Sequence, residues 1–315
     1  MKVKKDKDIK KFVNNWQITR RDFLRNSTLV IGGFSLGFVP ACSQKSGDNK
    51  KVRFVMATDL HYADTDPRGE RFYRESLPKM SECVKMANAK KADFIIELGD
   101  FKDQNNPPDE KSTLTNLKTV ENIFSKFKGP RYHVIGNHDT DSISKEQFLN
   151  IVENTEIPKQ AKYYSFDVNK LHFIVLDANF NSDGSDYDHG NFDWTDANIP
   201  SHEIEWLKND LASTSYSVIV FIHQQLDENG SHTVKNAAVI RDILKESAKV
   251  LTVFQGHFHE GAYNKIDGIH YYTLKAMVTG DGEDNNSYAL VEVLDNNDVI
   301  VSGYRKAQTK KMLKE

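Results

Sequence analysis

The sequence predicts an α/β domain with two β-sheets, in which much of the strand pairing is parallel. Two observations lead to this fold class. From Lys51 to Val152, short apolar runs alternate with stretches of helical periodicity, a pattern typical of parallel strands joined by helices. The second half contains a hairpin and a final group of strands joined by short turns. No repeat or linker separates the halves, so one domain is the simplest interpretation of the 315 residues, of which 38% are hydrophobic.

In the first half, three apolar runs are expected to be strands: KVRFVMAT, DFIIELG and RYHVIG. Each is followed by helical periodicity, which predicts helices around residues 74–89, 113–127 and 145–152. This alternation favours parallel pairing among the three strands.

In the second half, YYSFDVNKLHFIVLDA predicts a hairpin that turns at Asn169 and Lys170. The strands SVIVFIH and KVLTVFQ follow, each after a helix, near residues 203–211 and 234–245. The segments YNKIDGIHYYTL, SYALVEVL and VIVSGYRK then predict three or four strands with short turns. We place the domain at residues 51–308 and expect a polar tail at 309–315.

Residues 1–41 have the composition of an export signal. Arg20 and Arg21 precede the apolar run STLVIGGFSLGFV, which is short and glycine-rich for a membrane span. The paired arginines resemble the twin-arginine signal, which exports proteins that are already folded. We therefore expect the protein outside the cytoplasmic membrane.

The residues around Cys42 favour attachment to a membrane by lipid. Val39, Pro40, Ala41 and Cys42 resemble a bacterial lipobox, in which Cys42 would be acylated and become the mature N-terminus. Val39 and Ala41 also suit cleavage without lipidation. Residues 42–50 are polar and are expected to be a flexible tether, so the protein is predicted to be periplasmic or a lipoprotein of the cell envelope.

The charge argues against a nucleic-acid-binding protein, and the cysteine content argues against a protein that is stabilised by disulfides. Of the 42 Lys and Arg and 45 Asp and Glu residues, nine basic and three acidic residues precede residue 42, which leaves the remainder a formal charge of about −9. This excess of acidic groups argues against a general nucleic-acid-binding protein. With Cys42 acylated, Cys83 has no partner for an intramolecular disulfide, and we expect it to be a small buried residue of a helix.

Polar residues follow each strand predicted in the core of the domain. The strand ends are followed by DLH, GD, GNHD, a single histidine and GHFH, which supply these donors: Asp59, His61, Asp100, Asn137, His223, His257 and His259. Ligands of α/β sheets gather beyond the carboxyl ends of the strands. Taken alone, each residue could be a helix cap, a turn residue or a histidine at the core edge. Taken together they predict one site, and oxygen and nitrogen donors without thiolates suit Mn, Fe, Zn or Mg.

The order DxH, GDxxD, GNHD, single His and GHxH resembles the calcineurin-like metallophosphoesterase superfamily over residues 52 to about 305. The resemblance implies a four-layer α/β/β/α sandwich with two mixed sheets and a dinuclear metal site at the strand ends. One departure is His223-Gln224-Gln225, where many members carry His-His-Pro.

The resemblance also implies roles for individual residues. The first ion would be held by Asp59, His61, Asp100 and His259, and the second by Asp100, Asn137, His223 and His257. Asp100 would bridge the two ions with its two oxygens. His138 would act as an acid or electrophile. We expect Asp139 to orient the His138 ring, the alternative being a solvated loop carboxylate.

A narrower resemblance involves RGERFYRESL at residues 68–77, together with FIVLDA and GHFHEGAYNKIDGIHYYTL. These stretches look like the manganese-dependent ADP-ribose/CDP-alcohol diphosphatases. Arg71, Tyr73 and Arg74 would then lie near a phosphate or nucleotide. The alternative is exposed arginines that pair with Glu70 and Glu75.

The Asp/Gly-rich loop NFNSDGSDYDHGNFDWTD is long enough to be functional. Phe180 and Trp194 in this loop either stack on a nucleotide base or anchor the loop. Its five aspartates also allow an additional cation.

We therefore expect a hydrolase of phosphoester or pyrophosphate bonds that acts on a small phosphorylated, nucleotide-type substrate. Two divalent ions would serve as cofactors, with Mn favoured over Fe or Zn, because paired cations clamp a phosphate and activate a water. A phosphomonoesterase is one alternative, and a metal-bearing binding lipoprotein without catalysis is another. The sequence carries no signal of an oligomeric state.

Overall fold

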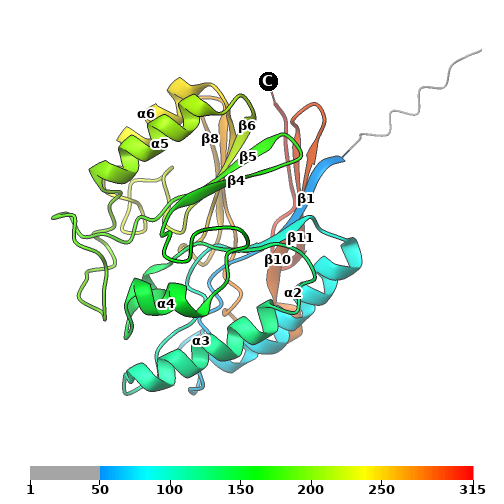
Figure 1. Ribbon diagram of the computed structural model, residues 1–315. Coiled ribbons are helices and arrows are strands. Elements are labelled where there is room, and N and C mark those ends of the chain that lie inside the picture. The colour runs from blue at the N-terminus through cyan, green and yellow to red at the C-terminus, as the bar shows by residue number, and fades with distance from the viewer. Residues whose placement is uncertain (1–49, 315) are drawn as a thin grey trace, which may run out of the picture. The chain divides into compact units, whose positions relative to one another are not determined.

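The computed structural model describes residues 50–314, which form two six-stranded sheets packed face to face with helices on their outer faces (Figure 1). The predicted export signal, Cys42 and nearly all of the predicted tether lie outside the described residues. Within residues 50–314, no helix combines the length and the apolar character needed to cross a membrane.

The first sheet has the strand order β12-β11-β10-β1-β2-β3. Its strands are β1 (Lys50–Ala57), β2 (Phe94–Glu97), β3 (Arg131–His133), β10 (Ser287–Leu294), β11 (Val299–Arg305) and β12 (Lys310–Met312). β1, β2 and β3 are parallel, whereas β10 runs antiparallel to β1, so the sheet is mixed.

The second sheet has the order β4-β5-β6-β7-β9-β8. Its strands are β4 (Tyr164–Val168), β5 (Leu171–Val175), β6 (Ser217–Phe221), β7 (Val250–Gln255), β8 (Ala262–Ile266) and β9 (Ile269–Thr273). The four inner strands are parallel, and β4 and β8 are antiparallel edges. Asn169 and Lys170 both have positive φ, 48° and 63°, which confirms the predicted two-residue hairpin turn.

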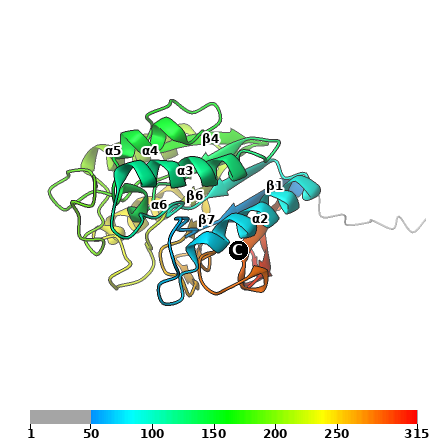
Figure 2. The ribbon, with the colours of Figure 1, turned by 90° about the horizontal axis from the view of Figure 1, so that it is seen from below.

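The helices cover the two outer faces of the sandwich. The first sheet is covered by α2 (Ser76–Lys90), α3 (Glu110–Phe124) and α4 (Lys145–Ile151), and the second by α5 (Ser201–Ser213) and α6 (Ala237–Ser247). Figure 2 shows α2 and α3 lying side by side over their sheet. Local signals begin two of these helices: Asp109 accepts a hydrogen bond from the backbone of Ser112, and Ser144 forms a capping box with Gln147.

The alternation of side chains along the strands produces four layers. In β1, Phe54 points between the sheets, while Val55 and Ala57 point toward the helices. The Phe54 ring stacks on Phe94 at 4.7 Å and meets Phe173 of the opposite sheet edge-on at 5.9 Å. Each fully buried phenylalanine stabilises the fold by roughly 1.5–3 kcal/mol. The predicted α/β/β/α sandwich is confirmed.

Two predictions about individual segments have different outcomes. Cys83 is buried on α2, as predicted. The predicted polar tail at 309–315 is wrong, because β12 pairs with β11 and buries Met312 between the sheets. A three-residue edge strand turns only one side chain, here Met312, toward the core. Because Lys310 and Lys311 precede it, the segment has no apolar run that would predict a strand.

Candidate metal centre

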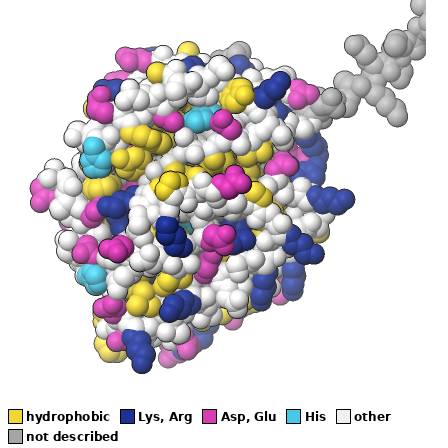
Figure 3. Space-filling model, in the orientation of Figure 1, with side chains coloured by type: hydrophobic (Ala, Val, Ile, Leu, Met, Phe, Trp, Pro, Cys, Tyr) yellow, Lys and Arg dark blue, Asp and Glu magenta, His cyan; other side chains and the backbone are white. Residues whose placement is uncertain are grey.

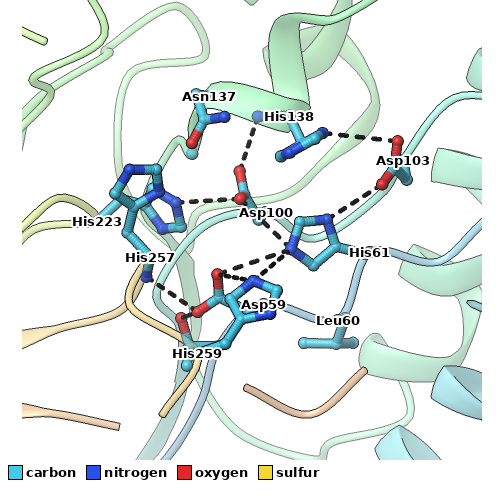
Figure 4. Close-up of polar contacts among 12 residues, drawn as sticks. Asp59, Leu60, His61, Asp100, Asp103, Asn137, His138, His223, His257 and His259 are labelled. Carbon is cyan, nitrogen blue, oxygen red and sulfur yellow. Dashed lines mark hydrogen bonds and ion pairs between the residues drawn. The ribbon is translucent and has the colours of Figure 1, made fainter. Parts of the chain in front are cut away.

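The connections that follow β1, β2, β3, β6 and β7 meet at the carboxyl ends of the strands (Figure 4). All seven predicted ligands come together there: Asp59, His61, Asp100, Asn137, His223, His257 and His259. The two histidines of GHFH lie in different groups, His259 with Asp59 and His61, and His257 with Asp100 and His223.

Glycines allow these connections to approach one another closely. A Cβ on Gly136 would lie 2.1 Å from the backbone nitrogen of Asp100, and one on Gly256 would lie 2.1 Å from Thr58 Oγ1. Neither glycine has space for a side chain. Gly256 is therefore required by close packing.

The backbone at the ligand positions is unusual. Asp59, His61, Asp100 and His257 have φ values of 52°, 48°, 58° and 66°. Such left-handed conformations cost free energy in residues with a side chain and persist only where surrounding contacts enforce them. Here the Asp59 amide donates to Gly99 O at 3.0 Å, and the His61 amide donates to Asp100 O at 2.8 Å.

The first ligand group consists of Asp59, His61 and His259. Asp59 Oδ1 lies 3.4 Å from His259 Nε2 and 3.7 Å from His61 Nε2. The other oxygen, Oδ2, accepts hydrogen bonds from Thr58 Oγ1 at 2.7 Å and from the His257 amide at 3.1 Å. One oxygen of Asp59 is thus held by the protein, and the other faces the two imidazoles.

The second ligand group consists of Asp100, His223 and His257, with Asn137 beside it (Figure 4). Asp100 Oδ2 lies 3.2 Å from His223 Nε2 and 3.5 Å from His61 Nε2, so this single oxygen faces both groups. Oδ1 instead accepts the backbone N–H of His138 at 2.7 Å. Asp100 therefore lies between the two groups, where a bridging ligand is expected, and faces both of them with Oδ2.

Four buried atoms of this centre have no hydrogen-bond partner: Asp59 Oδ1, Asn137 Oδ1, His223 Nε2 and His257 Nε2. A buried polar atom without a partner costs roughly 1–3 kcal/mol. All four belong to predicted ligands, and each has the oxygen or imidazole nitrogen chemistry that divalent cations accept. The residues therefore fit a pair of divalent metal ions.

The protonation states agree with this assignment. Burial alone would raise the pKa of Asp59 and of Asp100, but the surrounding imidazoles outweigh it and hold the pKa of both carboxyls well below the usual range. Burial, reinforced by His223, lowers the pKa of His257. The two carboxylates are thus anionic and His257 is neutral, the forms in which these groups bind metals. For His223, burial alone would lower the pKa, but Asp100 outweighs it and raises the pKa to about 9, so His223 would release a proton when it binds an ion.

His138 faces the cavity from the short helix η2 (Asn137–Thr140). It lies outside the two ligand groups described above. Its Nδ1 lies 2.7 Å from Asp141 Oδ2 and 3.6 Å from Asp103 Oδ1. Burial alone would lower its pKa, but Asp103, Asp141 and Asp100 outweigh it and raise the pKa of His138 well above the usual range. These carboxylates therefore favour the protonated, positively charged form of His138.

Asp139 does not orient the His138 ring, and this prediction is wrong. Its carboxylate is buried and accepts backbone N–H groups of Asp100 at 3.0 Å, Phe101 at 3.0 Å and Gly136 at 2.8 Å. It therefore ties the GD connection to the GNHD connection. In a 3₁₀ turn the side chains at i and i+3 eclipse, so Asp141, rather than the adjacent Asp139, lies on the side of His138.

Asp103 and Asp141 are functional residues that the sequence analysis did not assign. Asp103 Oδ2 lies 3.2 Å from His61 Nδ1 and 3.5 Å from Arg71 Nη1. Asp103 therefore connects the predicted ligand His61 to Arg71 and His138 at the cavity. The GDxxD motif contained this signal for Asp103. For Asp141, the signal was its spacing of three residues from His138.

Two of the three predicted substrate residues lie at the cavity, and the third does not. Arg71 and Tyr73 line the cavity, and Arg71 Nη1 lies 3.4 Å from His138 Nε2. Arg74 does not line it: the guanidinium binds Asp64 at 2.6 Å and Asp66 at 2.7 Å. The prediction for Arg74 is wrong, because it lies on the short helix η1 (Tyr73–Glu75), which directs the side chain toward these exposed aspartates.

The cavity at the centre has a volume of about 710 Å³. Trp194 on its wall is 41% exposed, and its ring lies 5.2 Å from that of His232 and 5.6 Å from that of His257. Phe180 is buried instead, with Lys145 Nζ 3.6 Å from its ring centre. Phe180 therefore anchors the long loop, and Trp194 remains available to a ligand.

The aspartates of the long loop have other partners. Asp186 pairs with Lys145 and Lys162, while Asp183 and Asp193 accept backbone N–H groups of Ser185 and Thr195. Among the described residues, the groups of His, Cys, Asp and Glu that could hold an ion all lie at the centre itself. The loop therefore gives no support for an additional cation.

Comparisons with known proteins agree with a phosphoesterase site. Residues 52–261 match the Calcineurin-like phosphoesterase family. Two relatives named manganese-dependent ADP-ribose/CDP-alcohol diphosphatase are similar in sequence. The Arabidopsis thaliana protein is 25% identical over 300 residues, covering 81% of this chain and 95% of its own. The Oryza sativa protein is 23% identical over 301 residues, covering 81% and 92%. A dimetal phosphatase from Danio rerio has the same fold, with a TM-score of 0.73 over 85% of this chain and 100% of that one at 16% identity.

Proposed function

The chain belongs to the calcineurin-like phosphoesterase family, and we propose that within this family it hydrolyses the diphosphate bond of small nucleotide-type substrates. That it is a metal-dependent phosphoester hydrolase follows from the family and the complete set of ligands. The proposal adds the substrate class, of the ADP-ribose or CDP-alcohol kind, and manganese as the favoured metal, which are the substrate and metal in the names of its relatives.

One juxtaposition carries the proposal: the exposed Trp194 ring shares a cavity with His138 and the ligands. An exposed indole offers a stacking surface to a nucleotide base, worth roughly 1–3 kcal/mol. A phosphate at the metal centre and a base on Trp194 describe the two parts of a nucleotide. A simple phosphomonoester makes no use of this wall.

The residues of the chain divide the chemistry among them. One ion would be held by Asp59, His61 and His259, and the other by Asn137, His223 and His257. Asp100 would contact both ions. When bound, the two cations position a phosphate and an attacking water and neutralise the charge that develops.

His138 and Arg71 act on the substrate. With His138 protonated, its Nε2 and Arg71 Nη1, 3.4 Å apart, are both donors, and two adjacent cationic donors favour an anionic oxygen between them. The Nε2 proton of His138 is available to the leaving oxygen, while Asp141 holds Nδ1. Asp103 keeps Arg71 beside the centre.

Two alternatives remain distinct from this proposal. A phosphomonoesterase that acts on substrates without a base would use the same centre but gain nothing from Trp194. A binding lipoprotein has no need for a charged His138 and Arg71 beside its metals. Purified protein with Mn²⁺ should release AMP from ADP-ribose and CMP from a CDP-alcohol faster than phosphate from p-nitrophenyl phosphate. Equal or faster turnover of the monoester would favour the phosphomonoesterase, and no turnover of any substrate by metal-loaded protein would favour the binding protein.

We also propose that the protein is exported by the twin-arginine route and held at the cell envelope by acylated Cys42. The proposal is supported by Arg20 and Arg21 before a short apolar run, and by the lipobox-like residues before Cys42. A single lipid signal gives weak anchoring unless a second contact supports it.

A further inference from the structure

The two ends of the sandwich differ in what they carry. Parallel strands place their carboxyl ends, and with them the metal centre, at one end. The opposite end contains the start of β1, the α2–β2 and α3–β3 connections, the β4–β5 turn and the last residues of the chain. Figure 1 shows the start of β1 and the C-terminus together at this end.

Exposed lysines gather at this opposite end. Six of them, here called the lysine end, come from four separate segments: Lys91, Lys126, Lys128, Lys170, Lys311 and Lys314. In Figure 3, Lys and Arg side chains gather along the side of the molecule where β1 begins. This concentration is local, because the chain after residue 41 has a formal charge of about −9.

The charges of the lysine end are not neutralised within the protein. In the described part of the chain, none of its six lysines forms an ion pair. The nearby Asp93 and Asp298 instead accept backbone N–H groups of Arg53 and Lys314. Burial, together with repulsion from Lys170 and Lys314, lowers the pKa of Lys51 despite the nearby Asp295. The six ammonium groups therefore remain available to an anionic partner outside the protein.

Helix chemistry explains only part of this pattern. Lysines near the C-terminus of a helix interact favourably with its dipole, which accounts for Lys91 after α2 and Lys126 after α3. Lys170 lies in a hairpin turn, and Lys311 and Lys314 lie in and after β12, far from any helix end in the sequence. These three lysines, and Lys128 four residues past the end of α3, need another explanation.

The chain itself indicates which partner meets this end. Residues 1–49 join the domain at Lys50, within the same end, and the predicted acylation site Cys42 lies eight residues before it. Eight extended residues span at most about 28 Å. A lipid on Cys42 would therefore hold the lysine end close to a bilayer surface.

We propose that the lysine end docks on the anionic headgroups of a lipid bilayer. Each Lys near an anionic surface contributes to binding by charge attraction, which acts within a Debye length. This contact would add charge attraction to the attachment that lipid on Cys42 provides, and it would orient the domain on the surface. The metal centre, at the opposite end, would then face away from the membrane and remain open to small soluble substrates.

The test uses the chain from Ser43, which lacks the basic signal and the acylation site. All of the core clusters lie between Val52 and Met312, so this protein contains everything that the fold requires. Sedimentation with vesicles of phosphatidylcholine, with and without phosphatidylglycerol, measures binding. The test variant is K91Q/K128Q/K170Q. The matched control is K111Q/K118Q/K235Q, which removes three exposed lysines elsewhere.

We expect binding to vesicles that contain phosphatidylglycerol and little to phosphatidylcholine alone. The test variant should bind at least about tenfold more weakly, the control should bind like the unaltered chain, and both should keep their phosphoesterase activity. Equal binding by the two variants, or by the two kinds of vesicle, would overturn the proposal. So would a test variant that binds vesicles normally but loses affinity for a DNA oligonucleotide, which would assign the lysine end to nucleic acid.

Discussion

His138 Nδ1 lies 2.7 Å from Asp141 Oδ2, and this contact holds an imidazole that lines the cavity beside the predicted metal ligands. Asp139, next to it in the sequence, instead accepts backbone N–H groups from two connections. The two carboxylates therefore have separate functions, which single substitutions can distinguish.

Substitution of His138 should separate chemistry from metal binding. H138A should keep both ions and lose about 10²- to 10⁴-fold in turnover, as expected when an acid is removed. The loss should be smaller for p-nitrophenyl phosphate, whose leaving group needs little protonation. D141N should lose less than H138A and alter the pH profile, because it removes the partner of Nδ1 but leaves the ring. If H138A empties the site, the roles assigned here are wrong.

Substitution of Asp100 should remove metal as well as activity. We expect D100N to lose nearly all turnover. Asp100 faces both ligand groups with one oxygen atom, and a neutral amide oxygen in its place cannot balance the charge of two dications. H257A should also lose bound metal. Metal analysis of the purified variants checks both, with H138A as the control. Two ions per chain and normal turnover in D100N would remove Asp100 from the bridging position.

Trp194 should determine preference for a nucleotide. W194A should raise KM for ADP-ribose by about tenfold, because a stacked base contributes roughly 1–3 kcal/mol, and leave p-nitrophenyl phosphate hydrolysis unchanged. W194F keeps an aromatic face and should recover most of the affinity. Steady-state kinetics of both substrates provides the measurement. An equal loss for both substrates would mean that Trp194 supports the cavity rather than the base.

The N-terminal segment gives a prediction about location. Changing Arg20 and Arg21 to lysine should block export, since the twin-arginine signal requires the pair. C42A should leave the mature protein soluble. Fractionation of cells that produce each variant checks both results. Soluble mature protein from the unaltered gene would instead indicate cleavage without lipidation.

His172 should make stability depend on pH. Its two ring nitrogens lie 2.7 Å from Asp167 and from Asp210. Burial alone would lower its pKa, but the contacts with Asp210 and Asp167 outweigh it, so the pKa of His172 is raised. A raised pKa adds stability that is fully present below the unfolded value, near 6.5, and is lost as pH rises through the folded value.

The corresponding variant is H172Q. Its free energy of unfolding should fall by about 1 kcal/mol at pH 6 and by less at pH 9, a modest effect because Asp167 is 56% exposed and screened by water. Urea unfolding at the two pH values measures this. H202Q, which changes an exposed histidine of α5, serves as the control. The same loss at both pH values would show that His172 stabilises by packing alone.

The sequence by itself predicted which side chains meet at the centre. Asp59, Asp100 and His223 each follow an apolar strand, and parallel pairing brings the ends of such strands to one edge whatever the details of packing. The strand and helix periods also determined the layers, because alternate side chains of a strand such as β1 must face opposite sides. These features depend on order along the chain and on regular geometry.

Only the tertiary structure decided how side chains outside the regular elements are used. It placed Asp141 rather than Asp139 against His138, Arg71 in the cavity, and Arg74 among surface aspartates. It also buried Phe180 under Lys145. In turns and loops no repeating period sets the direction of a side chain. Each direction depends on local φ and ψ and on partners far along the chain, which adjacency in the sequence does not reveal.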